Sequence, residues 1–203
     1  MPVTARPLAG SFYRRDAADV APDLLNKVIV HAGRAARIVE VEAYRGVDDP
    51  GSHAYRGRTP RNATMFGPPG RLYVYFVYGM HWCANAVCGD DGEAMAVLLR
   101  AAAPLRGLEA MRALRPSARR DRDLCSGPAK LCQALGLDGS HDGADLVAPG
   151  GGVRIVADGT APPTEPGRSA RVGLSTGADL VLRWFVPGDP NLTPGTKVML
   201  IRG

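Results

Sequence analysis

Hydrophobic and polar positions alternate clearly in the segment from Arg37 to Tyr44. Successive side chains of a β-strand point to opposite faces, so this period of two predicts a half-buried strand. One face of that strand would carry Ile38, Glu40, Glu42 and Tyr44, and the other would carry Val39, Val41 and Ala43.

Three more apolar runs follow, at residues 72–78, 82–88 and 94–100, separated by turn-forming residues. Apolar runs of this length bounded by turns predict an antiparallel meander. Beyond Gly139 the chain is rich in Gly and Pro, and only short strands are expected there. They are predicted near residues 153–156, 180–186 and 197–201.

Helical signals lie between and around these strands. Residues 16–25 and 104–114 repeat apolar positions at helical spacing, and Pro128 suits the first position of a helix that Gly136 would end. Residues 45–69, rich in Gly, Pro, Asp and Asn, form a long irregular loop, a kind of segment that tends to be functional. The pattern predicts an α+β fold in which residues 1–203 form a single domain with a largely antiparallel sheet.

Composition places the chain among ordinary globular proteins, with 45% hydrophobic and 22% charged residues. No apolar run reaches the roughly 18–20 residues that span a bilayer, and Met1–Arg6 lacks the apolar core of a secretory signal. We therefore expect a cytoplasmic protein with no membrane association.

The chain is basic, with a net charge of +5 and all but three of its 25 Lys and Arg residues being Arg. Guanidinium groups suit phosphate binding, although the charge alone is equally compatible with a merely basic surface. The four cysteines show no zinc-site spacing, so we expect buried thiols and no metal. They are Cys83, Cys88, Cys125 and Cys132.

Aromatic residues are concentrated in one segment, because eight of the twelve Phe, Tyr and Trp residues lie between Tyr44 and Trp82. Aromatic rings fill cores or stack on other flat rings such as nucleobases. Glu42 and Tyr44 would share a strand face about 6.6 Å apart, so the carboxylate could activate a water beside a stacked ligand. The alternative is a solvent-facing glutamate, as ordinary as Glu40.

Other side chains extend this candidate site. Tyr75 would provide a second stacking surface beside Tyr73, whereas Tyr78 and Met80 would lie at an exposed hairpin tip or fold back on the core. Asn85 would be a buried amide that either finds partners or reads a ligand.

His53 and the start of the Pro128 helix are less specific signals. His53 would donate to a ligand, make a structural hydrogen bond or do neither. Residues 126–130 would offer a helix N-terminus to phosphate.

Taken together, these segments resemble the alkyladenine (3-methyladenine) DNA glycosylase family over nearly the full chain, from about Leu8 to Ile201. The resemblance rests on separate motifs in the right order: RIVEVEAY at 37–44, His53, RTPRN at 58–62, Met65 and Phe66, LYVYFVYGM at 72–80, and CSGPAKLC at 125–132. Small departures are His81 after Met80, Tyr55 and Arg56 in the long loop, and a short basic loop at 115–122.

The resemblance implies a monomeric enzyme that needs no cofactor or metal and acts on double-stranded DNA with damaged purines. Such an enzyme would flip 3-methyladenine, 7-methylguanine, hypoxanthine or ethenoadenine out of the duplex and hydrolyse the N-glycosidic bond, initiating base excision repair near the nucleoid. The implied fold is a curved antiparallel sheet with a protruding β-hairpin, formyltransferase C-terminal-domain-like.

The resemblance also assigns roles to individual residues. Glu42 would be the general base, Tyr44 and Tyr75 would sandwich the base with help from His53, and Asn85 would obstruct the 2-amino group of guanine. Tyr78 and Met80 would intercalate, and Arg100, Arg115 and Lys130 would contact the DNA backbone.

A lyase step is not expected, since it needs an amine nucleophile and no lysine lies between Tyr44 and Asn85. Two other readings remain open from the residues: a protein that recognises distorted duplex without cutting, and a hydrolase of free nucleosides.

Overall fold

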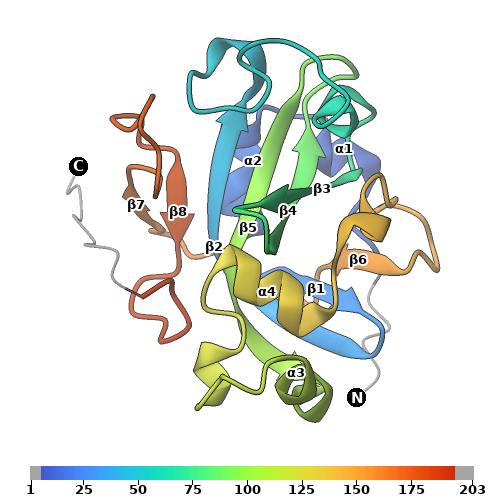
Figure 1. The fold of residues 1–203 in the computed structure, drawn as a ribbon, viewed down its shortest axis with the longest axis vertical. Helices are drawn as coiled ribbons and strands as arrows, with labels where there is room; N and C mark the ends of the chain where they lie inside the picture. Colours follow the sequence, from blue (N-terminus) through green and yellow to red (C-terminus); the bar gives the residue numbers. More distant parts are fainter. Residues whose placement is uncertain (1–5, 195–203) are drawn as a thin grey trace.

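The computed structural model describes residues 6–194 and centres on one curved, antiparallel sheet (Figure 1). The strands along the sheet follow the order β3-β4-β5-β2-β1-β6, and β7 and β8 attach to β2. Their bounds are β1 Val28–His31, β2 Arg34–Arg45, β3 Leu72–Val77, β4 His81–Cys88, β5 Met95–Arg106, β6 Val153–Val156, β7 Gly167–Ser169 and β8 Arg183–Phe185. The predicted meander is β3-β4-β5, and the α+β class is confirmed.

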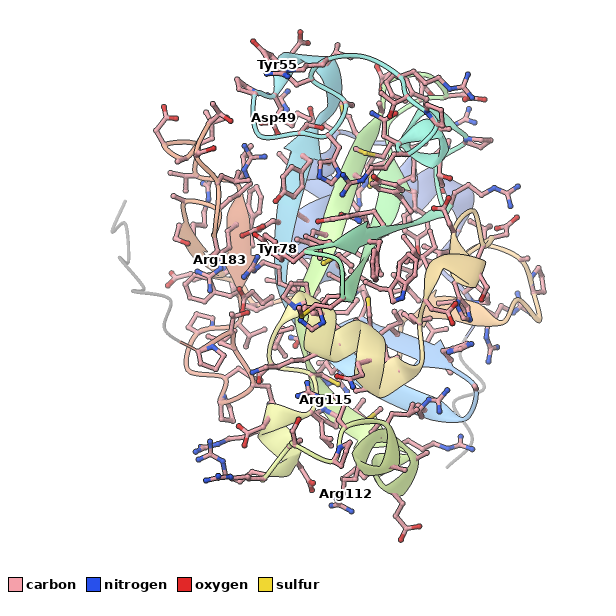
Figure 2. All side chains as sticks on the ribbon, in the orientation of Figure 1. Asp49, Tyr55, Tyr78, Arg112, Arg115 and Arg183 are labelled. Atoms are coloured by element: carbon pink, nitrogen blue, oxygen red, sulfur yellow. The ribbon has the colours of Figure 1, made fainter. Side chains whose placement is uncertain are left out.

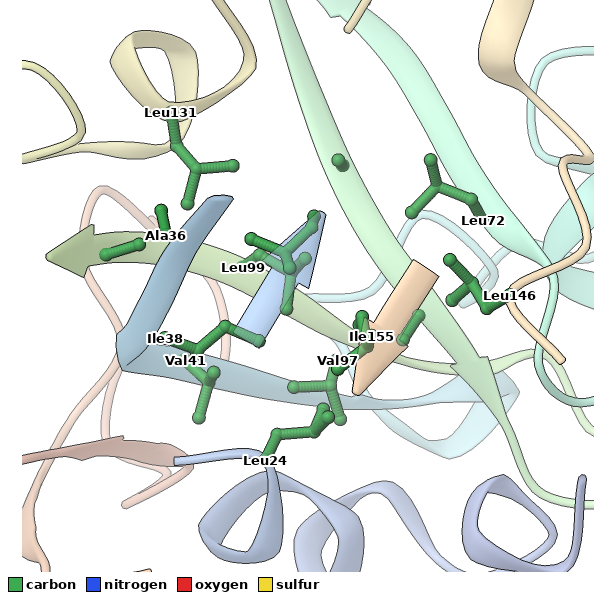
Figure 3. Close-up of a cluster of buried hydrophobic side chains, with 14 of the residues drawn as sticks. Leu24, Ala36, Ile38, Val41, Leu72, Val97, Leu99, Leu131, Leu146 and Ile155 are labelled. Carbon is green, nitrogen blue, oxygen red and sulfur yellow. The ribbon is translucent and has the colours of Figure 1, made fainter. Parts of the chain in front are cut away.

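Helices cover both sides of the sheet, with α2 behind it and α4 in front of it in Figure 1. The α-helices are α1 Gly10–Tyr13, α2 Ala17–Leu24, α3 Leu108–Leu114 and α4 Pro128–Leu135, and short 3-10 turns occupy Gly46–Asp48, Ala63–Phe66, Asp121–Asp123 and Gly139–His141. Leu24 of α2 and Leu131 of α4 belong to the same buried cluster as Val97 and Ile155 of the sheet (Figure 3). No helix among residues 6–194 is long and apolar enough to cross a membrane.

The predicted start and end of the Pro128 helix are confirmed, and the helix expected at residues 16–25 is α2. Asp16 precedes α2 and its carboxylate accepts from Ala18 N, as an N-cap does. Pro128 begins α4, and Gly136 ends it with a left-handed φ of 68°. Helix α3 begins at Leu108 rather than at residue 104, because β5 continues to Arg106 and Gly107 turns the chain with a φ of +76°.

A β-bulge in β2 changes which side chains share a face. Ile38 pairs with Ala102 while Glu40 pairs with the adjacent Ala101, so Val39 is an extra residue on β2. Ile38 therefore lies in the main core cluster with Val41 and Ala43, and its predicted place beside Glu40, Glu42 and Tyr44 is wrong. The pattern on the C-terminal side of the bulge stays as predicted.

Some short elements were not predicted, namely α1, β1 and β7. The strand expected at residues 180–186 is the shorter β8, and the one expected at residues 197–201 lies outside the described residues. All four cysteines are free and buried, as expected.

Candidate active site

A cavity of about 410 Å³ opens over the β3–β4 hairpin and the facing parts of β2 and β5. The long loop after β2, the start of α4 and the segment after β7 complete its lining. The cavity brings together six of the predicted site residues: Tyr44, His53, Tyr75, Tyr78, Asn85 and Arg100. Its volume lies within the range of about 300–1,000 Å³ that is common for small-molecule sites.

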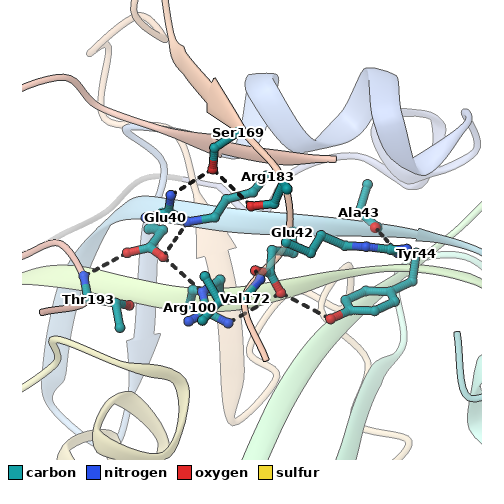
Figure 4. Close-up of polar contacts among 11 residues, drawn as sticks. Glu40, Glu42, Ala43, Tyr44, Arg100, Ser169, Val172, Arg183 and Thr193 are labelled. Atoms are coloured by element: carbon teal, nitrogen blue, oxygen red, sulfur yellow. Dashed lines mark hydrogen bonds and ion pairs between the residues drawn. The ribbon is translucent and has the colours of Figure 1, made fainter. Parts of the chain in front are cut away.

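Glu42 is fully buried behind this cavity, so the solvent-facing alternative is wrong. Its Oε1 accepts from Val172 N at 2.7 Å, and its Oε2 accepts from the Tyr44 hydroxyl at 3.0 Å and from Arg100 Nη1 at 3.3 Å (Figure 4). All three donor residues line the cavity. A carboxylate offers about four acceptor positions, so Glu42 retains one for a water.

The environment of Glu42 sets its basicity. Burial raises the pKa of the carboxyl group, and Arg100, Val172 N and the Tyr44 hydroxyl oppose that effect without cancelling it. A carboxylate that is harder to ionise is also a stronger proton acceptor once it is ionised. This is the property required of a general base.

A buried ion pair between Arg171 and Asp49 packs against the Tyr44 ring and supports it. The Arg171 guanidinium carbon lies 4.6 Å from the centre of the Tyr44 ring, and both guanidinium nitrogens Nη1 and Nη2 bind the Asp49 carboxylate. Arg171 Nη1 also donates to the Ala43 carbonyl at 3.0 Å. One face of the ring therefore packs against a fixed cation, and the Tyr44 side chain also lines the cavity.

Tyr73, Tyr75 and His53 form an aromatic group on the β3 side of the cavity. Tyr73 and Tyr75 stack at 5.4 Å between ring centres, which confirms that they share a strand face, and the His53 ring meets Tyr75 edge-on at 4.5 Å. Burial, with a smaller contribution from Arg61, lowers the pKa of His53. His53 is therefore neutral at pH 7, with Nδ1 at 3.2 Å from the Tyr73 hydroxyl. Nε2 is the nitrogen left for a ligand.

Asn85 lies opposite Tyr73 across the hairpin and is 4% exposed. Its Nδ2 donates to the Tyr73 carbonyl at 3.1 Å, and the side chain also lines the cavity. The two interpretations of this buried amide are therefore compatible, because it has a partner and also borders the cavity.

The hairpin tip exposes its large side chains. Tyr78 and Gly79 both have positive φ, 54° and 68°, and Met80 N donates to the Val77 carbonyl, which makes the tip a type I′ turn. The side chains of Tyr78 and Met80 are 84% and 68% exposed (Tyr78 in Figure 2), so the alternative of a tip folded onto the core is wrong. The positive φ also ends the strand alternation, and Tyr78 borders the cavity as well.

The three predicted backbone contacts lie in different environments. Arg100 and Arg115 are only 5% and 6% exposed. Arg100 is ion-paired with Glu40 and Glu42, and Arg115 donates Nη1 to the Leu124 carbonyl. Both guanidinium groups are thus largely buried, and their contact with the DNA backbone stays a prediction. Lys130, half-buried in α4, has Nζ 3.5 Å from Ser126 Oγ.

Glu40 is the residue whose place was most misjudged. It is fully buried, and it accepts from Arg183 Nε and Arg100 Nε at 2.8 Å each and from Thr193 N at 2.7 Å (Figure 4). Burial alone would raise its pKa, but these hydrogen bonds and charges lower it. The residues missed by sequence reasoning are Asp49, Arg171, Val172 and Arg183. The first three lie in segments without periodicity, and Arg183 lies in the predicted strand β8, where no signal marks it as part of the site.

Comparison with known proteins gives consistent results. The family described as Methylpurine-DNA glycosylase matches residues 11–190. Similar proteins of Burkholderia lata and Burkholderia cenocepacia are 60% identical over 183 residues and 58% identical over 192 residues. The alignments cover 90% and 92% of this chain and 88% and 93% of those relatives.

A more distant similar protein, from Streptomyces avermitilis, is 48% identical over 194 residues, with 93% of this chain and 91% of the relative covered. All three relatives carry the name "Putative 3-methyladenine DNA glycosylase".

Proposed function

Because this chain belongs to the methylpurine-DNA glycosylase family and is therefore a DNA N-glycosylase, we propose that it flips damaged purines out of duplex DNA and hydrolyses their N-glycosidic bond beside Glu42. The observation that carries the proposal is the buried Glu42 carboxylate behind an aromatic cavity, hydrogen-bonded by three residues that line it. The substrates are 3-methyladenine, 7-methylguanine, hypoxanthine and ethenoadenine, and the enzyme acts as a monomer, one catalytic domain, on DNA in the cytoplasm.

The target base must leave the stack, because a base inside the duplex hides its glycosidic bond. Tyr78 and Met80 at the exposed tip enter the duplex and fill the position that the base vacates. Insertion offsets the cost of a few kcal/mol for unstacking and unpairing. Lys130, at the start of α4, contributes a phosphate contact next to the cavity.

The extruded purine stacks between Tyr44 on one side and Tyr75 with His53 on the other. Alkylated purines are cationic, so the electron-rich faces of these rings attract them. Asn85 lies where it would meet a 2-amino group, which disfavours normal guanine. The hydrogen bond to the Tyr73 carbonyl keeps the amide in that place.

Glu42 takes a proton from a water as the water attacks C1′ of the sugar, and the glycosidic bond breaks with its electrons going to the purine. A cationic purine departs neutral and needs no further proton, whereas hypoxanthine must be protonated as it leaves. No lysine lies between Tyr44 and Asn85, so the enzyme stops at hydrolysis and leaves an abasic site.

The test is single-turnover base release from two substrates, a duplex oligonucleotide that contains hypoxanthine and methylated duplex DNA. We expect Glu42→Gln to abolish release while lesion binding changes by no more than a few-fold, since the amide keeps the size of the side chain. Glu109→Gln, the same change at an exposed glutamate of α3, is the matched control and should retain wild-type release.

Release that survives in Glu42→Gln would remove the general-base role. A wild type that binds lesions but releases no base would identify a damage-recognition protein. An affinity that does not change with salt concentration would point to a free nucleoside as substrate. Contacts to DNA phosphates weaken steeply as the salt concentration rises.

A further inference from the structure

Glu40 has no part in the mechanism above, although it is as deeply buried as Glu42. The two carboxylates lie two residues apart on one strand, and both have 0% exposure. Two buried like charges this close cannot both stay ionised without compensating cations. The contacts of Glu40 therefore bear on the state of Glu42.

One guanidinium serves both carboxylates. Arg100 extends from β5, where Ala101 pairs with Glu40 and Leu98 pairs with Glu42. Its Nε donates to Glu40 at 2.8 Å, and its Nη1 donates to Glu42 at 3.3 Å (Figure 4). The shorter of the two hydrogen bonds is thus made to Glu40.

Glu40 is itself fixed from separate parts of the fold. Arg183 of β8 donates its Nε hydrogen at 2.8 Å to Glu40 Oε1, the oxygen that also accepts from Arg100. Ser169 of β7 in turn fixes Arg183, because its hydroxyl oxygen accepts from Arg183 Nη1 at 2.9 Å. Thr193 N donates to Oε2 at 2.7 Å. The cluster of two carboxylates and two guanidiniums has no net charge, so the pairing is balanced although it is buried.

We propose that Glu40 is a positioning residue for Glu42, because it anchors Arg100 by Nε and divides the positive charge of that guanidinium between two carboxylates. This inference rests on the proposed function, in which Glu42 is the general base. An Arg100 paired with Glu42 alone would hold Glu42 ionised but make it a poor proton acceptor. Sharing Arg100 leaves Glu42 more basic than full pairing with that guanidinium would.

The directions of the two pKa values agree with this division. Burial raises the pKa of Glu42, Arg100 opposes that rise, and the negative charge of Glu40 adds to it. For Glu40 the effect of burial is outweighed by Arg183 and Arg100, and its pKa is lowered. The titratable and charged groups near Glu42 come from several elements: Glu40 and Tyr44 of β2, Tyr75 of β3, Cys83 of β4, Arg100 of β5 and Arg183 of β8.

The experiment is the pH profile of single-turnover 7-methylguanine release from duplex DNA for the wild type and Glu40→Gln. A cationic purine needs no proton to leave, so the acidic limb of the profile reports the general base. Glu40→Gln removes a negative charge and frees Arg100 for Glu42. Both changes lower the pKa of Glu42, and we expect the limb to move down by about one pH unit with a lower plateau rate.

Arg183→Gln should act in the opposite direction. The variant leaves Arg100 as the only guanidinium on Glu40. Less of the positive charge of Arg100 then acts on Glu42, and the acidic limb should move to higher pH. Asp158→Asn is the matched control. It removes a carboxylate that pairs with a different arginine, Arg37 of β2, at the surface. Its limb should stay in place.

The proposal would be overturned if Glu40→Gln folds and the acidic limb of its pH profile stays at the wild-type pH, whatever its plateau rate. A purely structural role lowers the rate without moving the limb. If Glu40→Gln does not fold, Arg183→Gln decides by the same criterion. Failure of both variants to fold would assign Glu40 to folding and also overturn it. A wild type without release would instead refute the proposed function, an outcome seen before any variant is compared.

Discussion

Replacement of Tyr78 by asparagine should make the protein more stable and a worse enzyme. In a type I′ turn both central residues need positive φ, and Asn-Gly is the preferred pair. The chain has Tyr78-Gly79 instead, with φ of 54° at the tyrosine. A bulky aromatic residue in this conformation signals a use that outweighs its strain.

The stability gain follows from strain and exposure. The left-handed conformation costs an ordinary residue about 1–2 kcal/mol, and asparagine tolerates it better. Because the Tyr78 side chain is 84% exposed, its removal sacrifices little buried surface. Tyr78→Asn should therefore stabilise the fold by about 1 kcal/mol, which corresponds to a rise in Tm of about 2–4 °C for a chain of this size.

The loss on DNA follows from stacking. A base–aromatic stack contributes about 1–3 kcal/mol, so its removal should reduce the flipped fraction by about 5- to 150-fold. Thermal unfolding followed by circular dichroism measures the first effect. Fluorescence of 2-aminopurine placed beside the lesion measures the second, since the analogue brightens when it unstacks.

Tyr55→Asn is the matched control, because Tyr55 is an exposed tyrosine (50%) without positive φ in the long loop (Figure 2). It should change neither Tm nor flipping. A Tyr78→Asn protein that melts several degrees lower would show that the tip packs onto the fold. Normal flipping by that variant would show that Tyr78 does not enter the duplex.

Two further predictions concern the cavity and its support. Asn85→Ser should admit 2-amino purines, so release of guanine from undamaged duplex should rise above wild type; unchanged selectivity would remove the steric role of Asn85. Asp49→Asn leaves Arg171 buried without its carboxylate and should cost about 3–5 kcal/mol at pH 7 in urea unfolding. Arg171 holds the pKa of Asp49 below its usual value despite burial, so this stabilisation is present above about pH 4 and is lost as pH falls through the lower folded pKa. A variant–wild-type difference that does not begin to shrink as pH falls below about 4 would contradict that assignment.

Local pattern was sufficient for the elements that position the site. The alternation around Glu42 and the apolar runs at residues 72–78 and 82–88 predict three of the four strands that line the cavity, and Pro128 and Gly136 mark the ends of α4. These signals are short-range, and the structure preserves them. The bulge at Val39 could not be predicted from this local pattern. The residues on each side of an extra residue keep their own alternation, so the pattern does not show where the two sides change register.

The electrostatic part of the site depended on contacts across the chain. Glu40 and Glu42 read as an exposed polar face because their guanidinium partners, Arg100 and Arg183, lie 60 and 143 residues away from Glu40. Arg171, which supports Tyr44, likewise comes from a segment without regular structure. Only the fold shows that the charges of this face are paired.

The segment around Glu42 and the hairpin tip at Tyr78 lie at different places in one sheet. We therefore expect them to resist local unfolding to different degrees. Glu42 lies on β2, which is hydrogen-bonded to β5 on one side and, at Glu42, to β8 on the other. Tyr78 directly follows β3, which is last in the sheet order and pairs with β4 alone among the strands. Backbone amides near Glu42 should open only with the whole domain, whereas those at the tip open in small, frequent fluctuations. If the tip enters DNA as proposed, insertion would take place at a readily opened strand end, whereas Glu42 would stay in the part of the sheet that opens least.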